Sequence, residues 1–399
     1  MSLATHPARA FMPYPAAAVP SAPSGPLHGL TFAAKDLFDV AGYPTGGGNP
    51  HVLALSGIKT ATAPAVQRLL DAGAAFVGKT HTDELAFSMN GKNAHYGSPV
   101  NGAAPGRITG GSSSGSASAV SNRLCDFALG SDTGGSVRAP ASHCGLFGIR
   151  PTHGRISLER TLALAESLDT CGFFARDIAT FSRVADVLLG ADARALPGAP
   201  RLLLAEDLFG LPTAPALDAL LPVVGRVEAA LGKAAPVTVM NQPLLDIWWA
   251  FRYVQGWEAW QADGELIEQY GLQLGPDVAG RFAFSKSVTA AQFEASTAIR
   301  RAVTAHVGAL LGDDGVLLMP TMPDIAPLSD ADDNTLEDHR NRSSQILCLA
   351  PLTGFPQMSL PLSGRAGAPL GISLMGPAGS DRSLIAFAAR LVEALGQVS

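Results

Sequence analysis

Residues 110–140 read GGSSSGSASAVSNRLCDFALGSDTGGSVRAP, and two glycine- and serine-rich clusters in this stretch decide the fold. An Ala- and Ser-rich segment between the clusters is typical of a helix. A glycine pair loses much backbone entropy when a chain folds, so it is costly inside a well-packed protein. We therefore interpret the second pair, Gly134 and Gly135, as a turn in which consecutive backbone amides converge on one point.

Converging amides can stabilise the negative charge that develops on an oxygen atom during acyl transfer. The predicted oxyanion-hole donors are the amides of Thr133, Gly134, Gly135 and Ser136. The hydroxyl group of Ser136 would lie at the edge of this nest. Asp132 and Arg138 flank the turn, and we expect them to brace it as structural partners. An ordinary ion pair away from the chemistry is the alternative for these two residues.

Residues 73–80, GAAFVGKT, match the phosphate-loop pattern G-x-x-x-x-G-K-[ST] letter for letter. That loop works when a strand precedes it and a helix follows, so that the helix N-terminus faces phosphate. Here residues 62–72 have helical spacing and precede the motif, and residues 74–77 are typical of a strand. The sequence therefore does not favour a nucleotide site.

Residues 111–115, GSSSG, also match the G-x-S-x-G nucleophile elbow, with Ser113 as the nucleophile. An acid and a histidine should then follow, and the available histidines are His143, His153, His306 and His339. Against this, residues 101–107 (NGAAPGR) are not the strand that an elbow requires. A serine esterase with a histidine base and a plain Ser/Gly linker remain open at this point.

Three separated motifs, in order, resemble the amidase signature family: residues 110–115 (GGSSSG), 130–138 (GSDTGGSVR) and 144–154 (CGLFGIRPTHG). The resemblance extends upstream to GLTFAAKD (29–36) and downstream to GISLMGPAGSD (371–381). It implies an α/β fold with a single large mixed β-sheet covered by helices on both faces. Apolar strand-like runs near both ends of the chain, with helical patterns between them, agree with this fold class.

The resemblance implies a triad in which Ser136 is the nucleophile, Ser112 is a bridging serine after a cis peptide bond, and neutral Lys35 is the base. A serine nucleophile needs a partner that takes its proton. Lysine can be that partner only if burial lowers its pKa from about 10.4. The implied reaction hydrolyses a small carboxamide to a carboxylic acid and ammonia through an acyl-enzyme on Ser136, with no metal and no cofactor.

Stretches at 42–46, 89–97 and 205–209 resemble the short branch of the family that includes indole-3-acetamide hydrolases, which implies an aryl- or indole-acetamide substrate. Trp249, Tyr253, Trp257 and Trp260 share one helical face. This aromatic face either lines the substrate pocket or packs into the core. A glutaminase subunit of a tRNA-dependent transamidase, which shares the triad, is the nearest alternative function. A catalytically silent binding protein is the remaining alternative.

The 399 residues are 47% hydrophobic and 16% charged, which allows a large core. We expect residues 1–27 to be an irregular Pro/Ala-rich arm outside the fold, followed by an amidase domain at 28–399. Its predicted parts are a catalytic core (28–188), a variable helical substrate region (192–311), and closing strands and a helix (312–397).

The net charge of −6, without a Lys/Arg-rich run, predicts no nucleic-acid partner and no anionic-membrane partner. No apolar run reaches membrane-spanning length. The cysteines are widely spaced, which predicts reduced thiols in a cytoplasmic protein: Cys125, Cys144, Cys171 and Cys348. The expected partner is a small-molecule amide. A homodimer is left open, because the helical segment that precedes the lysine strand in longer members is mostly missing.

Overall fold

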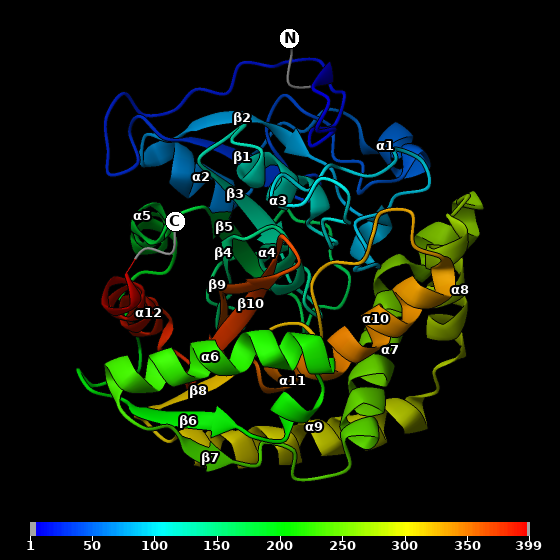
Figure 1. Cartoon of the computed structure of the whole chain (residues 1–399). Helices are drawn as coiled ribbons and strands as arrows, with labels where there is room; N and C mark the ends of the chain where they lie inside the picture. Colours follow the sequence, from blue (N-terminus) through cyan, green and yellow to red (C-terminus); the bar gives the residue numbers. More distant parts are fainter. Residues whose placement is uncertain (1–4, 397–399) are drawn as a thin grey trace.

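Strands from both ends of the chain pair in one ten-stranded mixed sheet in the computed structural model, which describes residues 5–396 (Figure 1). In sheet order the strands are β2 (Ala75–Thr80), β1 (Thr31–Lys35), β3 (Phe127–Ser131), β5 (Cys171–Ala175), β4 (Phe147–Arg150), β9 (Gln357–Arg365), β10 (Ala368–Met375), β8 (Gly315–Pro320), β6 (Arg201–Ala205) and β7 (Ala235–Val237). Neighbours are parallel at the two ends of the sheet and antiparallel from β3 to β8. The predicted fold class is confirmed.

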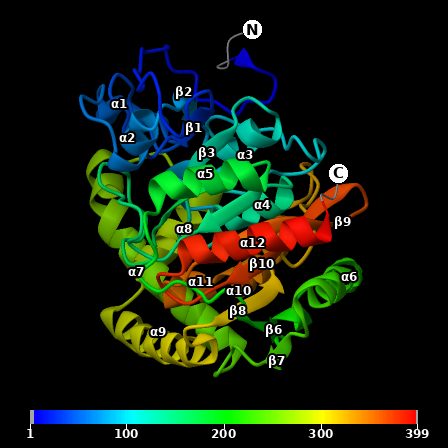
Figure 2. The ribbon, with the colours of Figure 1, turned by 90° about the vertical axis from the view of Figure 1, so that its left-hand side faces the viewer.

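Alternating side chains of the central strands face two helical layers, as strand geometry requires. Phe32 and Phe127 belong to the core beneath the first layer, whereas Ala33 and Ala128 belong to the core beneath the second. The first layer, seen face-on in Figure 2, contains α2 (Pro64–Asp71), α5 (Ile178–Leu188), α12 (Asp381–Leu395) and α6 (Ala214–Leu231). The second contains α3 (Ser114–Ser121) and α4 (Arg138–His143), then α7 (Leu244–Tyr270), α9 (Ala290–Leu311) and α11 (Leu349–Thr353).

The predicted helical region at 192–311 is mainly helical, but it is not separate from the sheet. Its strands β6 and β7 extend the sheet beyond β8. The remaining helices are α1 (Pro50–Ser56), α8 (Pro276–Ser287) and α10 (Asp333–Leu347). Both α8 and α10 pack against α7. Among residues 5–396, no helix is long and apolar enough to cross a membrane.

The N-terminal arm is irregular from residue 5 to residue 27, apart from one bridge between Phe11 and Thr80 of β2. The expectation that it lies outside the fold is wrong. Phe11 packs against α3 and Leu27 is fully buried in the main core, because apolar arm residues cover surface at the β2 edge. Positions 1–4 and 397–399, which belong to the first and last predicted segments, lie outside the described residues.

One edge of the sheet positions the functional side chains. Strands β1 and β3 are parallel neighbours, with Ala34 opposite Leu129. Their last residues, Lys35 and Ser131, therefore emerge side by side at the carboxyl ends of the strands.

Candidate active site

Lys35 is completely buried at the end of β1. Its Nζ atom lies 2.6 Å from Ser112 Oγ and 2.8 Å from Ser131 Oγ. Burial lowers the pKa of Lys35 to about 7, against the opposing influence of Asp83, Asp169 and Asp132, whose negative charges favour the ammonium form. A substantial fraction of this side chain is therefore neutral near pH 7, so it can accept a proton.

The backbone around Ser112 follows the geometry that the resemblance implies, since the Gly111–Ser112 peptide bond is cis. The Ser112 carbonyl accepts a hydrogen bond of 3.0 Å from the amide of Asp83. A Cβ atom on Gly111 would lie 2.2 Å from Asp83 Oδ2, so only glycine fits this close approach. Burial raises the pKa of Asp83 to about 6. Asp83 thus fixes the turn that presents Ser112 to Lys35.

The glycine turn is held by the carboxylate of Asp132. Its oxygens accept hydrogen bonds from the amides of Gly135 (2.9 Å) and Val137 (3.1 Å) and pair with Arg138 Nη2 at 2.8 Å. Arg150 donates to the Asp132 carbonyl and lies 3.4 Å from its Oδ1 atom. Burial acts to raise the pKa of Asp132, but the two guanidinium groups hold it well below its usual range. The Asp132–Arg138 pair therefore has the bracing geometry expected from the sequence.

One backbone amide of the nest is used to hold the turn, and the other three are free to bind a ligand oxygen. The prediction is wrong for Gly135, because its amide already donates to Asp132. The amides of Thr133, Gly134 and Ser136 have no hydrogen-bond partner among residues 5–396. Gly135 has a φ of +133°, and a Cβ atom there would lie 2.5 Å from Leu347 Cδ1. Glycine is therefore required both for backbone conformation and for space.

Ser136 lies beside this nest and is 6% exposed. Its carbonyl accepts a hydrogen bond of 3.2 Å from the amide of Ser113, which follows Ser112 in the chain. Its hydroxyl group has no hydrogen-bond partner among the described residues. The structure thus joins Lys35 to Ser112 directly and brings Ser136 next to the Ser112 segment through the backbone.

Gly134 and Ser136 line a small cavity of about 30 Å³ together with Phe251 and Arg252 from α7, Arg281 from α8 and Arg340 from α10. A second cavity of about 370 Å³ reaches Ser131 and Thr133 and is lined by leucines, among them Leu37, Leu162 and Leu164. The site is therefore flanked by one cavity with three arginines and by a second cavity in which leucines share the lining with polar residues, among them Glu159, Glu166 and Asp169.

Residues 7–204 match the sequence profile of the Amidase family. The chain is 38% identical to Amidase 1 of Arabidopsis thaliana over 388 aligned residues. The alignment covers 90% of this chain and 91% of the relative. The chain belongs to the amidase family. A solved structure described as an amidase superposes with a TM-score of 0.84 at 30% identity, covering 93% of this chain and 86% of that chain. The protein is therefore a hydrolase that acts on amide C–N bonds.

Another relative is the chloroplastic outer envelope protein 64 of Arabidopsis thaliana. It is 36% identical over 402 residues, which cover 94% of this amidase and 68% of the relative. The family therefore includes a protein named for an organelle envelope.

The nucleophile elbow has no support in the geometry of this amidase. Ser113 Oγ donates to the Ser131 carbonyl at 3.1 Å. His143 is buried and lies 3.4 Å from His339, and burial holds the pKa of His143 well below its ordinary value. No hydrogen bond joins a histidine to Ser112, Ser113 or Ser136 among residues 5–396.

The phosphate-loop motif of the amidase is part of strand β2 and not of a loop. Its lysine, Lys79, is buried, pairs with Asp36 Oδ1 at 3.0 Å and donates to Thr45 Oγ1 at 3.0 Å. Lys79 is therefore held in a structural ion pair within the sheet.

The predicted aromatic residues do not line the cavity at Ser136. Trp249 stacks on Tyr253 with ring centroids 5.5 Å apart, and Trp257 stacks on Phe293 at 5.5 Å. Trp260 lies beneath the ammonium group of Lys286. The pocket prediction is wrong for this cavity, because α7 presents a different face to it, that of Phe251 and Gln255.

Ser131 and Arg150 lie within the quoted motifs, but no sequence pattern gave them a role. Asp83, which holds the Ser112 turn, and the arginines around Ser136 were likewise not predicted. The position of Ser131 at the end of a strand parallel to that of Lys35 is the signal that could have identified it.

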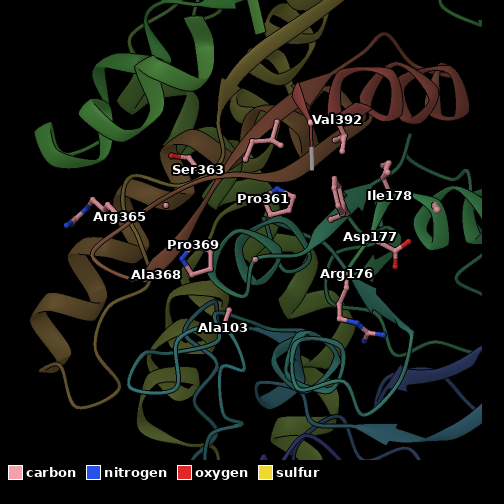
Figure 3. A pocket seen from close by; sticks show the side chains of 17 residues that line it. Ala103, Arg176, Asp177, Ile178, Pro361, Ser363, Arg365, Ala368, Pro369 and Val392 are labelled. Atoms are coloured by element: carbon pink, nitrogen blue, oxygen red, sulfur yellow. The ribbon is translucent and has the colours of Figure 1, made fainter. Parts of the chain in front are cut away.

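A cavity of about 710 Å³ lies at the opposite ends of the strands from Ser131. Figure 3 shows Pro361 and Pro369 across this cavity from Arg176 and Asp177. Phe147, which lines it, pairs with Ala175 at the far end of β5 from Cys171, the partner of Ser131. This cavity is therefore not part of the active site.

Proposed function

We propose that this amidase hydrolyses a small carboxamide to a carboxylic acid and ammonia through an acyl-enzyme on Ser136, with Ser112 and Lys35 moving the protons. The observation that carries this proposal is the contact of 2.6 Å between Ser112 and a buried Lys35 whose pKa is lowered to about 7. A base with a pKa near the working pH is well matched to general acid–base catalysis.

In the first step the Ser136 oxygen attacks the amide carbonyl carbon. Its proton passes to Ser112, and the proton of Ser112 passes to neutral Lys35. The carbonyl oxygen gains negative charge, which the free amides of Thr133, Gly134 and Ser136 stabilise. These donors are held in place before reaction by the Asp132 network, so no reorganisation is needed.

In the second step the C–N bond breaks and Ser112 donates a proton to the leaving nitrogen, while Lys35 returns a proton to Ser112. Water then attacks the acyl-enzyme through the same groups, and Ser136 leaves with a proton. The cycle consumes one amide and one water molecule and releases one acid and one ammonia. The three side chains end in their starting protonation states.

Labelling and turnover test the assignment together. A fluorophosphonate should attach to Ser136, as read by peptide mapping, and Ser136→Ala should abolish ammonia release. Ser157→Ala, which changes an exposed serine, is the control and should keep both properties. A label on Ser113, or ammonia release at an unchanged rate from Ser136→Ala, would contradict the proposal.

The second cavity is the surface that supports an aryl- or indole-acetamide substrate. Its leucines adjoin Ser131 and Thr133 and would favour an apolar acyl group. A panel of acetamide, phenylacetamide and indole-3-acetamide in the ammonia assay tests this part. Equal kcat/KM for all three amides would remove the argument for an aryl group.

We further propose that the amidase acts on its small-molecule substrate in the cytoplasm. In support, all four cysteines are free and buried, which is typical of proteins in reducing compartments. Burial raises the pKa of Cys125, Cys144 and Cys348 to about 12, so these thiols are poorly reactive. Protein purified without reductant should release four titratable thiols on denaturation. A smaller number would argue against this location.

A further inference from the structure

The cavity at Ser136 contains more positive than negative charge. Arg252, Arg281 and Arg340 reach it from three helices. Two carboxylates face these arginines. Arg281 Nη2 lies 2.5 Å from Asp277 Oδ1 and 3.7 Å from Glu337 Oε2, and Arg340 Nη1 lies 2.8 Å from Glu337 Oε1. One guanidinium group is therefore left without a partner of opposite charge.

That group is Arg252. Its guanidinium group lies over three aromatic rings, 5.1 Å from the centre of Trp248, 4.9 Å from Trp249 and 4.8 Å from Phe284. It makes no hydrogen bond or ion pair with residues 5–396. The rings hold the planar group in place, and its donors remain available to a ligand in the cavity.

Arg281 lies beside Arg252 and adds positive charge to the lining of the cavity. Its side chain is 7% exposed, and its Nε atom is buried without a hydrogen-bond partner. A buried charged donor without an acceptor costs folding free energy. Arg252 therefore carries the unpaired donors that an anionic, acceptor-only group in the cavity would satisfy, and Arg281 adds charge beside it.

We propose that the amidase also accepts short amides that carry a free carboxylate, and that Arg252, beside Arg281, binds this carboxylate while Ser136 attacks the amide. The proposal rests on the function proposed above. Guanidinium groups bind carboxylates through paired hydrogen bonds of favourable geometry. Arg252 thus acts as a specificity-determining residue that touches substrate and takes no part in proton transfer.

The size of the cavity favours a carboxylate over a phosphate group. It measures about 30 Å³, and one water-sized group needs roughly 10–15 Å³ by this measure. A planar carboxylate is smaller than a tetrahedral phosphate and suits a cavity of this size better. The same limit requires a short spacer between the carboxylate and the amide.

A matched pair of substrates tests the proposal on the wild-type enzyme. Succinamate and 4-oxopentanamide have the same spacer, but the first ends in a carboxylate and the second in an uncharged methyl ketone. We expect kcat/KM for succinamate to exceed that for 4-oxopentanamide by about 10- to 100-fold, since hydrogen bonds to charged groups discriminate at this level. This comparison needs no variant, so it decides the question even where a variant fails to fold.

Variants locate the effect. Arg252→Gln should reduce the succinamate to 4-oxopentanamide ratio by at least about tenfold. Arg301→Gln removes an equal charge from an exposed position on α9 and is the matched control, which should keep the wild-type ratio. A ratio that falls equally in both variants would overturn the assignment to Arg252.

Failure of this inference can be told apart from failure of the proposed function. If the fluorophosphonate labels Ser136 but 4-oxopentanamide is hydrolysed as well as succinamate, the carboxylate proposal is overturned and the function stands. If Ser136→Ala releases ammonia at the wild-type rate, the proposed function itself is wrong.

Discussion

Lys35 Nζ lies 2.6 Å from Ser112 Oγ, and both side chains are completely buried. The lysine is buried beside three aspartates, yet none of them forms an ion pair with it among the described residues. Its nearest polar neighbours are two serine hydroxyl groups. Hydroxyl groups stabilise an ammonium ion less than a paired carboxylate would, so the lysine remains able to lose its proton near neutral pH.

The first prediction concerns the pH dependence of turnover. Only neutral Lys35 can accept a proton, and its pKa is lowered to about 7. Below that pH the lysine is protonated and the rate falls, so kcat/KM should rise with pH through about 7 and level off at higher pH. The measurement is kcat/KM for one neutral amide between about pH 5 and pH 9.

Substitutions identify the group that titrates. Lys35→Ala should lose several orders of magnitude in kcat, and Lys35→Arg should do little better, because guanidinium does not release its proton at usable pH. Lys233→Ala, at a lysine whose side chain is 88% exposed, is the control. Near-normal turnover by Lys35→Ala, together with an inactive His143→Ala variant, would show that a histidine is the base.

The second prediction concerns Ser131, whose Oγ atom lies 2.8 Å from Lys35 Nζ. Ser131→Ala removes an acceptor that favours the charged lysine, so the rising limb of the pH profile should move to lower pH. The maximal kcat should fall about tenfold or more, because one contact that orients the lysine is lost. Ser116→Ala is the matched control, since this buried serine donates to the Leu129 carbonyl at 2.8 Å and does not contact Lys35. An unchanged profile in Ser131→Ala would show that Ser131 has no effect on the lysine.

The third prediction concerns the Asp132 network. Asp132→Asn leaves the buried guanidinium groups of Arg138 and Arg150 without their carboxylate. Breaking a buried pair in this way should lower the free energy of unfolding by about 3–5 kcal/mol. It should also lower kcat, because asparagine offers one acceptor oxygen to the glycine turn where the carboxylate offers two. Urea denaturation and ammonia release measure the two effects.

An exposed ion pair provides the comparison for Asp132. Asp314 pairs with Arg201 at 3.0 Å, and both side chains are about half exposed. Asp314→Asn should leave the urea midpoint and the turnover near the wild-type values, since exposed pairs contribute little. Equal destabilisation by the two substitutions would mean that the buried Asp132 network contributes no more to the free energy of unfolding than an exposed ion pair.

The glycine turn could be predicted from the sequence because its requirements are local. The positive φ of Gly135 and the contact between Gly111 and Asp83 both demand glycine at fixed positions. Apolar runs such as residues 315–319 likewise predicted buried strands, and β8 covers that segment. The fold class and the glycine turn could therefore be predicted from short stretches of sequence.

The arginines around Ser136 could not be predicted in this way. Arg252, Arg281 and Arg340 come from three helices that meet only in the folded chain. Helical spacing showed that the aromatic residues of α7 share a face, but spacing does not show which face points to the active site. Phe251 and Gln255, on the other side of the same helix, took that position.

The fourth prediction follows from the position of Trp257, which stacks on Phe293 of α9 away from Ser136. Trp257→Ala should lower the free energy of unfolding by about 3 kcal/mol, the lower end for removal of a large aromatic side chain, because this residue is only partly buried. The kcat/KM ratio of phenylacetamide to acetamide should not change. Leu162→Ala, within the leucine-lined cavity, is the contrast and should change that ratio. A large change in the ratio for Trp257→Ala with an unchanged melting temperature would restore the aromatic face as a substrate site.

The last prediction uses Lys35 as a probe of stability. Its pKa is about 7 in the folded protein and about 10.4 in the unfolded chain. Between these values the unfolded state binds more protons than the folded state, so this lysine destabilises the fold progressively as pH falls from about 10 to 7. Below about pH 7 both states are protonated and the penalty is constant.

Lys35→Met keeps the apolar stem and removes the titration. At pH 7 the variant should therefore be more stable than the wild type, and its advantage should shrink as pH rises towards 10. The measurement is the difference in melting temperature between the two proteins at about pH 6, 7, 8, 9 and 10. Titrating groups that do not interact with Lys35 cancel in this difference, and Asp83, whose pKa is about 6, affects mainly the points at about pH 6 and 7. A constant difference across the series would show that Lys35 has the same pKa in the folded and unfolded states. An advantage that grows with pH would show that folding raises its pKa. Either result would remove the physical basis for Lys35 as a neutral base.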